Sequence, residues 1–172
     1  MKTKNNYAFI DGQNLFLGTK QSNWAINHKR LRIYLEKKYK VSQAYYFLGY
    51  VSESNHELYS NLQKAGFIVI FKEHTEGLLG KKKGNIDTDL VFEIMKSLVD
   101  DKEMEGVVLI SGDGDYKKLV DYLIKKDRFV KILFPNIEFA SFLYKKIDVK
   151  FKATLDQPEV RKKIEYKKSD KQ

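Results

Sequence analysis

Short apolar runs alternate with segments of helical periodicity along nearly the whole chain. The runs are rich in β-branched and aromatic residues, and the segments between them carry apolar residues at the spacing of a surface helix. Strands that alternate with helices favour right-handed crossovers and a parallel sheet covered on both faces. The sequence therefore predicts an α/β fold, a three-layer sandwich around a central, mainly parallel sheet of about five or six strands. The expected strands are Tyr7–Ile10, Val41–Val51, Phe67–Phe71, Gly106–Ile110 and Phe129–Phe134, and the expected helices are His28–Tyr39, Ser54–Ala65, Asn85–Asp100 and Tyr116–Lys126.

The region after the fifth expected strand continues the alternation less clearly. We expect a last helix near Ile137–Lys145 and a short strand near Asp148–Phe151. The folded domain is placed at residues 1–156, and residues 157–172 are expected to form a basic tail that is disordered or loosely docked. The segment Lys72–Gly84, rich in glycine and lysine, is expected to be a mobile loop.

Length and composition exclude several classes of protein. A chain of 172 residues suffices for one well-packed domain and is too short for two α/β domains. With 0 cysteines there is no disulfide, zinc–thiolate site or thiol nucleophile, so a metal would be held by oxygen atoms or by the 3 histidines. The longest apolar runs, Phe67–Phe71 and Val107–Ile110, are far shorter than the roughly 20 residues of a membrane-spanning helix. The polar segment Met1–Asn6 lacks the apolar core of a secretory signal, and we expect a cytoplasmic protein.

The chain is basic. Its formal net charge is +9, from 32 Lys and Arg against 23 Asp and Glu. Such an excess permits association with polyanions such as nucleic acid, although charge alone does not identify the partner.

Acidic residues fall where several expected strands end. In open α/β sheets, ligands bind outside the carboxyl ends of the strands, near the point where strand order reverses. Asp11 directly follows the first strand, and Asp113 and Asp115 follow the fourth. Asp87 lies in the first turn of the helix Asn85–Asp100, on its apolar side. These four acids are therefore expected to meet at one edge of the sheet.

Each acid also has an ordinary structural explanation. Asp11 precedes a glycine in a common turn, Asp115 could cap the next helix, and Asp87 could complement a helix dipole. Independent roles of this kind do not require four acids at one edge, so their joint placement favours a binding site. Oxygen-only ligands suit Mg²⁺ or Mn²⁺, and such a cation can stabilise the charge that develops at phosphorus during phosphodiester hydrolysis.

Three motifs, in this order and spacing, resemble the NYN domain, a branch of the PIN-like ribonucleases. The resemblance covers roughly residues 6–150 and implies a PIN-like fold and a metal-dependent nuclease that acts on RNA. The motifs are Phe9-Ile-Asp-Gly-Gln-Asn14, Lys83-Gly-Asn-Ile-Asp-Thr-Asp-Leu90 and Ile110-Ser-Gly-Asp-Gly-Asp-Tyr116.

The resemblance also implies roles for single residues. Asp11, Asp87, Asp113 and Asp115 match the acids of the family's site, and Asn14 matches a polar residue that helps to shape it. Taking position into account, we expect Asp11, Asp87 and Asp113 to bind the metal directly. Asp115 is expected to be an outer ligand or to orient the attacking water, because it is also placed to cap its helix.

A run of three lysines, Lys81, Lys82 and Lys83, precedes the helix that carries Asp87. One interpretation is a phosphate clamp that guides a single-stranded RNA toward the metal, and the other is a solvated loop. The basic residues of the tail are expected to be solvated only. The remaining aromatic residues, such as Trp24 and Phe16, have two interpretations, stacking on bases or packing in the core, and the core is favoured. The histidines, including His28, are expected on the surface.

Two other functions stay open. A phosphatase or phosphotransferase of another doubly wound fold also places an acid after the first strand, but its usual second acid two residues later is replaced here by Gln13. The second alternative is a nucleic-acid-binding or regulatory module that has lost turnover and acts through a partner or as a homodimer.

Overall fold

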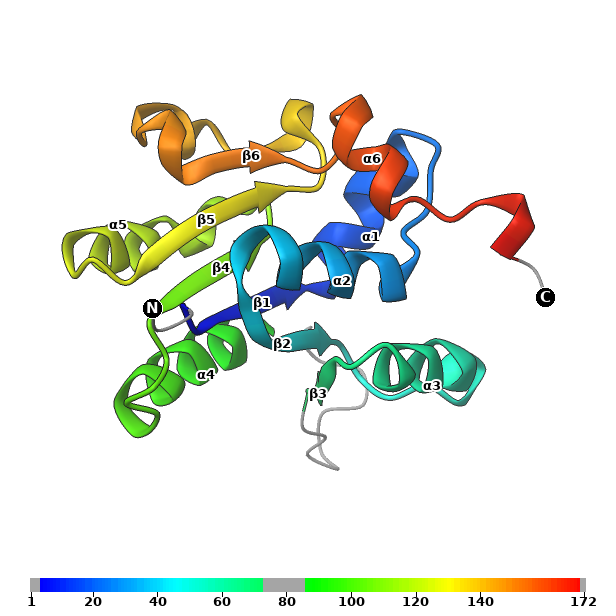
Figure 1. The fold of residues 1–172 in the computed structure, drawn as a ribbon, viewed down its shortest axis with the longest axis horizontal. Helices are drawn as coiled ribbons and strands as arrows, with labels where there is room; N and C mark the ends of the chain where they lie inside the picture. Colours follow the sequence, from blue (N-terminus) through cyan, green and yellow to red (C-terminus); the bar gives the residue numbers. More distant parts are fainter. Residues whose placement is uncertain (1–3, 73–85, 171–172) are drawn as a thin grey trace, which may run out of the picture.

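The computed structural model describes residues 4–72 and 86–170 and contains a six-stranded sheet in the order β3-β2-β1-β4-β5-β6. Every neighbouring pair of strands is parallel. Figure 1 shows the sheet from β6 at the top to β3 at the bottom. The expected α/β fold is confirmed. The strands are β1 (Asn6–Asp11), β2 (Val41–Leu48), β3 (Ile68–Phe71), β4 (Gly106–Ile110), β5 (Phe129–Phe134) and β6 (Lys152–Thr154), and the helices are α1 (Gly12–Gln21), α2 (His28–Tyr39), α3 (His56–Lys64), α4 (Ile86–Asp100), α5 (Lys117–Lys125) and α6 (Pro158–Ile164).

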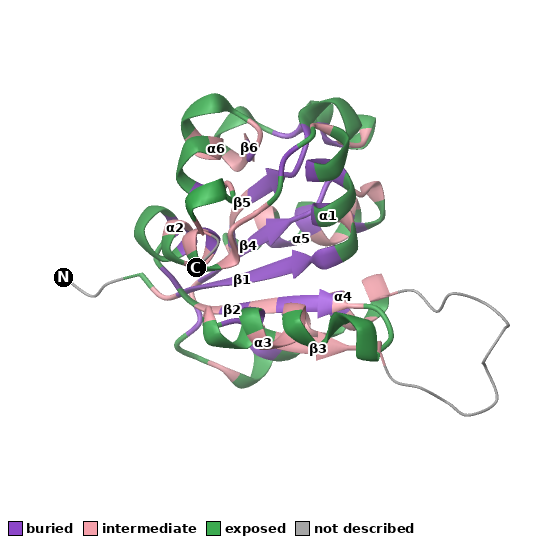
Figure 2. Ribbon diagram, turned by 90° about the vertical axis from the view of Figure 1, so that its right-hand side faces the viewer, coloured by how far each residue is buried: buried purple, intermediate pink, exposed green. Residues whose placement is uncertain are grey.

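The two central strands are buried along their whole length. Every residue of β1 and of β4 is buried, as expected for a parallel sheet with helices on both faces. One face packs against α1, α2, α3 and α6, through residues such as Leu35 and Ile164. The other face packs against α4 and α5, through residues such as Ile94 and Val120. Figure 2 shows this buried central layer with exposed helices on either side of it.

The strand order reverses at β1. The chain moves outward from β1 to β2 and β3, and then returns to place β4 on the other side of β1. In register, Asn6 pairs with Gly106 and Ile10 pairs with Ile110, so the two strands end side by side. This arrangement creates a crevice beyond the carboxyl ends of β1 and β4, where doubly wound folds bind ligands.

Helix α1 was not expected from the sequence, which indicated only a turn after the first strand. Asp11 starts the helix, since its carboxylate accepts a hydrogen bond from the backbone N–H of Asn14 at 3.0 Å. Gly12 lets the helix begin against β2, because a Cβ at this position would lie 2.6 Å from the carbonyl oxygen of Phe47. The helix therefore leaves the sheet directly above the crevice.

The predicted helix near Ile137–Lys145 is wrong. The segment forms two 3-10 turns, Ile137–Phe139 and Phe142–Lys146. Ala140 between them is extended, and the hydroxyl of Ser141 accepts a hydrogen bond from the N–H of Leu143 at 3.3 Å to start the second turn. A helix cannot continue through an extended residue.

Two further expectations for the C-terminal region are corrected. The residues Asp148–Phe151 are not a strand: Val149–Phe151 form a 3-10 turn, and β6 follows it. The region from residue 157 onward is not loosely held, because α6 buries Ile164 completely in the core. The guanidinium of Arg30 also bonds the carboxylate of Asp170 at 2.8 Å. The last turns are thus part of the packed domain up to the end of the described residues.

None of the helices in the described ranges is long and apolar enough to cross a membrane.

Candidate metal centre

Asp11 is the buried acid of the crevice. Its Oδ1 accepts the capping bond of α1, and its side chain is only 4% exposed. Its Oδ2 lies 3.4 Å from the hydroxyl of Ser111 and 3.2 Å from the hydroxyl of Tyr116, both of which can donate to it. Burial raises the pKa of the Asp11 carboxyl, and the charges of Asp87 and Asp113 raise it further. The bonds from Asn14 and Tyr116 act in the opposite direction.

Asp113 and Asp115 lie on the turn that joins β4 to α5. The carboxylate of Asp113 accepts a hydrogen bond from the N–H of Asp115 at 3.0 Å, and the N–H of Asp113 donates to the hydroxyl of Ser111 at 3.1 Å. The expectation that Asp115 caps its helix is therefore wrong. Asp113 is the capping residue, and Asp115 supplies the N–H that is capped. The shared turn fixes the two acids next to each other.

Asp87 comes to the crevice from the opposite side, in the first turn of α4. The buried residues Leu90 and Ile94 hold that side of the helix against the sheet. Oδ1 of Asp87 accepts a hydrogen bond from the hydroxyl of Tyr116 at 2.6 Å. As expected, Asp87 emerges at the edge of the sheet and not within the core.

Tyr116 links an acid at the end of β1 to an acid in the first turn of α4. Its hydroxyl carries one proton and lies within hydrogen-bond distance of both Asp11 and Asp87. Burial, followed by the charges of these acids, raises the pKa of Tyr116 well above its usual value, so the phenol stays protonated and can donate. The sequence showed an aromatic residue at this position but gave no sign of this role.

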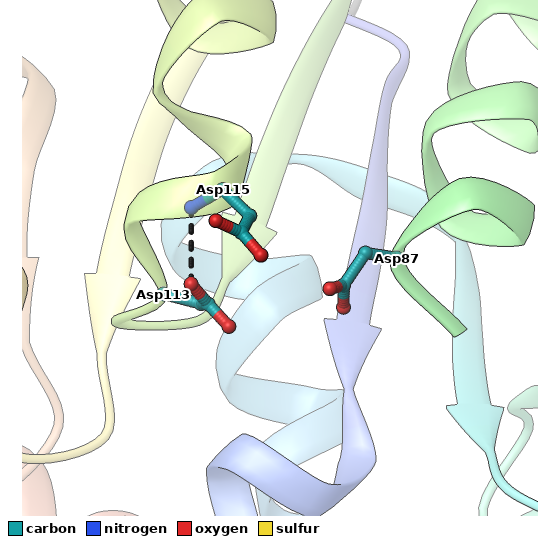
Figure 3. Close-up of side chains that lie close together, drawn as sticks. All are labelled: Asp87, Asp113 and Asp115. Carbon is teal, nitrogen blue, oxygen red and sulfur yellow. Dashed lines mark hydrogen bonds between the residues drawn. The ribbon is translucent and has the colours of Figure 1, made fainter. Parts of the chain in front are cut away.

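Three carboxylates form the closest group of acids in the described part of the chain. Asp87, Asp113 and Asp115 each offer one carboxylate oxygen, and these oxygen atoms all lie within 4.8 Å of one another. Figure 3 shows Asp87, which extends from the start of α4, facing Asp113 and Asp115 across the crevice. Asp11 is not in this group and is connected to it through the hydroxyl of Tyr116.

The donor set fits a hard cation. It consists of carboxylate oxygen atoms alone, which are the ligands of Mg²⁺ and Mn²⁺ and not those of zinc in structural sites. Carboxylates that lie this close together also repel one another in the absence of positive charge. The group could therefore hold one of these cations.

The acids open into a cavity of about 430 Å³. Gln13, Asn14 and Leu17 of α1 form part of its wall, together with Asp11, Asp87 and Asp113. Lys72, directly after β3, also lines it and was not singled out from the sequence. Its position at the carboxyl end of a strand was the available signal. The expected clamp of Lys81, Lys82 and Lys83 lies outside the described residues.

Two expectations about single aromatic and histidine residues need correction. Phe16 is not a core residue, because its side chain is 59% exposed on α1, whereas Trp24 is buried as expected. His28 is half-buried and not an exposed surface residue. Its ring lies edge-on to the rings of Tyr46 and Phe67, and burial lowers its pKa to about 4.

Comparisons with known proteins agree with the family resemblance of the motifs and with the fold. The sequence model of the NYN domain matches residues 7–151. The low amplitude and bright protein LabA of Synechococcus elongatus is 22% identical over 134 residues, which make up 73% of this chain and 70% of that protein. A crystal structure of a protein of unknown function from Vibrio parahaemolyticus superposes with a TM-score of 0.69 at 18% identity and covers 91% of this chain and 96% of that one. The structural likeness supports the fold alone.

Proposed function

Because the chain belongs to the NYN domain family, we propose that it is a metal-dependent nuclease that hydrolyses phosphodiester bonds of RNA. The observation that carries the proposal is the group of Asp87, Asp113 and Asp115 at the point where the strand order reverses. Acids from α4 and from the turn after β4 converge there, and the cap that Asp113 forms does not account for Asp87 and Asp115 beside it.

Asp87, Asp113 and Asp115 would hold Mg²⁺ or Mn²⁺. When bound, such a cation supplies positive charge where negative charge develops at phosphorus. Asp113 is fixed by its bonds within the turn, so its free carboxylate oxygen is held in place for this role. Asp115 stands beside it as the residue that would orient the attacking water, as the sequence already indicated.

We keep Asp11 as the fourth acid of the site. Its Oδ2 and Oδ1 of Asp87 both lie within hydrogen-bond distance of one hydroxyl, and the bond from Tyr116 favours the charged form of Asp11. Asn14 holds the loop after β4 through a hydrogen bond to Gly112 and thereby sets the distance between Asp11 and Asp113. Its role is to position the acids.

The substrate would approach as a polyanion. The net charge of +9 attracts a phosphate chain, and Lys72 offers a positive charge in the wall of the acidic cavity itself. Lys81, Lys82 and Lys83 stay proposed as a phosphate clamp on the segment that leads into α4. The choice of RNA rests on the family, and an unpaired strand remains the expectation drawn from the sequence.

Cleavage of a labelled single-stranded RNA, with DNA of the same sequence beside it, tests the proposal. The purified protein is assayed in Mn²⁺ or Mg²⁺, in a chelator, and as the Asp113→Asn and Asp100→Asn variants. Asp100 is an exposed acid at the far end of α4 and serves as the matched control. We expect cation-dependent cleavage that Asp113→Asn loses and Asp100→Asn keeps. Cleavage that survives both the chelator and Asp113→Asn would reveal a contaminating nuclease, and RNA binding without cleavage would favour the inactive binding module.

A further inference from the structure

Exposed apolar side chains lie on two segments that adjoin the acidic cavity. Two of them, Phe16 and Leu17, lie on the outer side of α1, and the others lie on the 3-10 turns that follow β5. Soluble proteins seldom expose several large apolar side chains in one place unless the surface binds something. We call this set the rim patch, and it consists of Phe16, Leu17, Ile137, Phe139, Phe142 and Leu143.

The fold holds both halves of the rim patch against the metal-binding segments. Leu17 itself lines the cavity that contains Asp87 and Asp113. On the other half, the N–H of Ser141 donates to the carbonyl of Gly112 at 2.9 Å, and the hydroxyl of Tyr144 donates to the carbonyl of Asp113 at 2.5 Å. The exposed turns are thus fastened to the loop that carries Asp113.

A lysine side chain lies over each of the two most exposed rings of the rim patch. The Nζ atom of Lys145 lies 4.3 Å from the ring centroid of Phe142, which is 72% exposed. On α1, Nζ of Lys20 lies 5.6 Å from the ring centroid of Phe16. Each site therefore pairs a flat apolar surface with a positive charge.

We propose that the rim patch is a stacking platform for the unpaired bases of a single-stranded nucleic acid, with Phe16 and Phe142 as the stacking rings. This inference rests on the proposed nuclease function and names how its substrate is held. Bases stack on aromatic rings whatever their sequence, while neighbouring cations bind the phosphates between them. A base-paired duplex cannot use such rings, because its bases are already stacked inside the helix.

The charge of the surface favours this occupant over another protein. An apolar patch that docks a protein is depleted of lysine at its centre, whereas here lysines stand over the exposed rings. Leu17 of the patch lines the cavity that holds the acids, and the turns of its other half are bonded to Gly112 and Asp113, so a strand on the platform would lie beside the proposed metal site. Docking of a protein partner or of a second copy of the chain would not require the acidic cavity to lie beside the patch.

A binding experiment in chelator separates the platform from the chemistry. We would measure fluorescence anisotropy of a labelled single-stranded RNA with Phe142→Ala, Phe16→Ala and the double variant. An abasic strand of the same length and the corresponding duplex serve as ligands that cannot stack. Tyr122→Ala is the matched control, because Tyr122 is also an exposed ring with a lysine 5.7 Å away. Tyr122 lies near the end of α5. The chain then passes through Arg128 into β5, so Tyr122 is near the amino-terminal ends of the strands, away from the candidate site.

We expect each rim variant to weaken binding of the RNA about tenfold, the loss that corresponds to ~1.4 kcal/mol of stacking, with abasic-strand binding unchanged. Tyr122→Ala should bind like the wild type. Equal binding of the RNA by all variants, or an equal loss for the abasic strand, would overturn the platform. So would a wild-type dimer that Phe142→Ala converts to a monomer. Ring-dependent binding by a protein that never cleaves RNA would support the platform and contradict the nuclease.

Discussion

The side chain of Asn14 accepts a hydrogen bond from the backbone N–H of Gly112 at 2.8 Å. The two residues are far apart in the chain, yet this bond joins the first turn of α1 to the loop that follows β4. Asp11 starts that helix and Asp113 follows that glycine, so one amide sets the separation of two acids of the candidate site.

Loss of the Asn14 amide should therefore cost both stability and activity. In Asn14→Ala the half-buried N–H of Gly112 loses its partner, which should lower the free energy of unfolding by about 1–2 kcal/mol. Chemical denaturation measures this change, and cleavage of RNA should fall as well, because the loop that carries Asp113 is released. Gln13→Ala, an exposed neighbour in the same turn, is the control and should leave stability unchanged. Equal losses in the two variants would contradict the role given to the bond.

The hydroxyl of Tyr116 should stabilise the protein when no cation is present. Tyr116→Phe removes the one donor shared by Asp11 and Asp87, so two acids face each other without it, and the pKa of Asp11 should rise further. At neutral pH in chelator, we expect the free energy of unfolding of the variant to be about 1–2 kcal/mol lower than that of the wild type. The deficit should shrink in acid, as the carboxylates become protonated. Tyr122→Phe, on the exposed side of α5, is the control.

The strands of the central sheet were predictable because burial on both faces leaves a continuous apolar run. The expected bounds Gly106–Ile110 and Phe129–Phe134 are those of β4 and β5. Helix α1 gave no such signal, since Leu15 is the one large apolar residue on its buried side, while Phe16 and Leu17 are exposed. Its buried side therefore lacked an apolar stripe at helical spacing.

The positions of the acids at one end of the sheet were predictable from the sequence, but the groups that connect these acids were not. Asp11, Asp113 and Asp115 were placed by the rule that ligands bind where parallel strands end, and Asp87 by its position on the apolar side of the first turn of its helix. The shared hydroxyl of Tyr116 depends on how the turn after β4 packs against α4, which no local pattern reveals. For the same reason, the cap was assigned to Asp115 although Asp113 forms it.

His28 should make stability depend on pH. Burial lowers the pKa of His28 from 6.5 to about 4, so the unfolded chain takes up a proton before the folded protein does. The contribution of neutral His28 is fully present above pH 6.5 and is lost as the pH falls to about 4, for a total of at most ~3 kcal/mol.

The difference in unfolding free energy between wild type and His28→Gln, measured from pH 8 to pH 4, isolates this effect from other titrating groups. Below pH 6.5 the unfolding free energy of the wild type should fall more steeply than that of the variant, because only the wild type has His28 to protonate. His56→Gln is the control, because His56 is exposed at the start of α3. A variant that loses stability in parallel with the wild type over this range would contradict the assignment.

Divalent cations should stabilise the folded protein through the acidic group. A ligand that binds only the folded state adds about 2.7 kcal/mol at a concentration of 100 times its Kd, so the melting temperature should rise with added Mn²⁺ or Mg²⁺. Asp113→Asn and Asp87→Asn each remove one ligand charge and should abolish most of this rise, and Asp115→Asn should weaken it. In chelator the same variants should be as stable as the wild type or more so, because one source of repulsion is gone.

Asp89→Asn provides the matched control for this titration. Asp89 shares the first turn of α4 with Asp87 but is not among the three acids whose oxygen atoms group together. Its variant should respond to Mn²⁺ as the wild type does. If Asp113→Asn kept the full rise in melting temperature, the cation would be bound elsewhere, and the acids of the crevice would have only the structural roles that their caps and hydrogen bonds already give them.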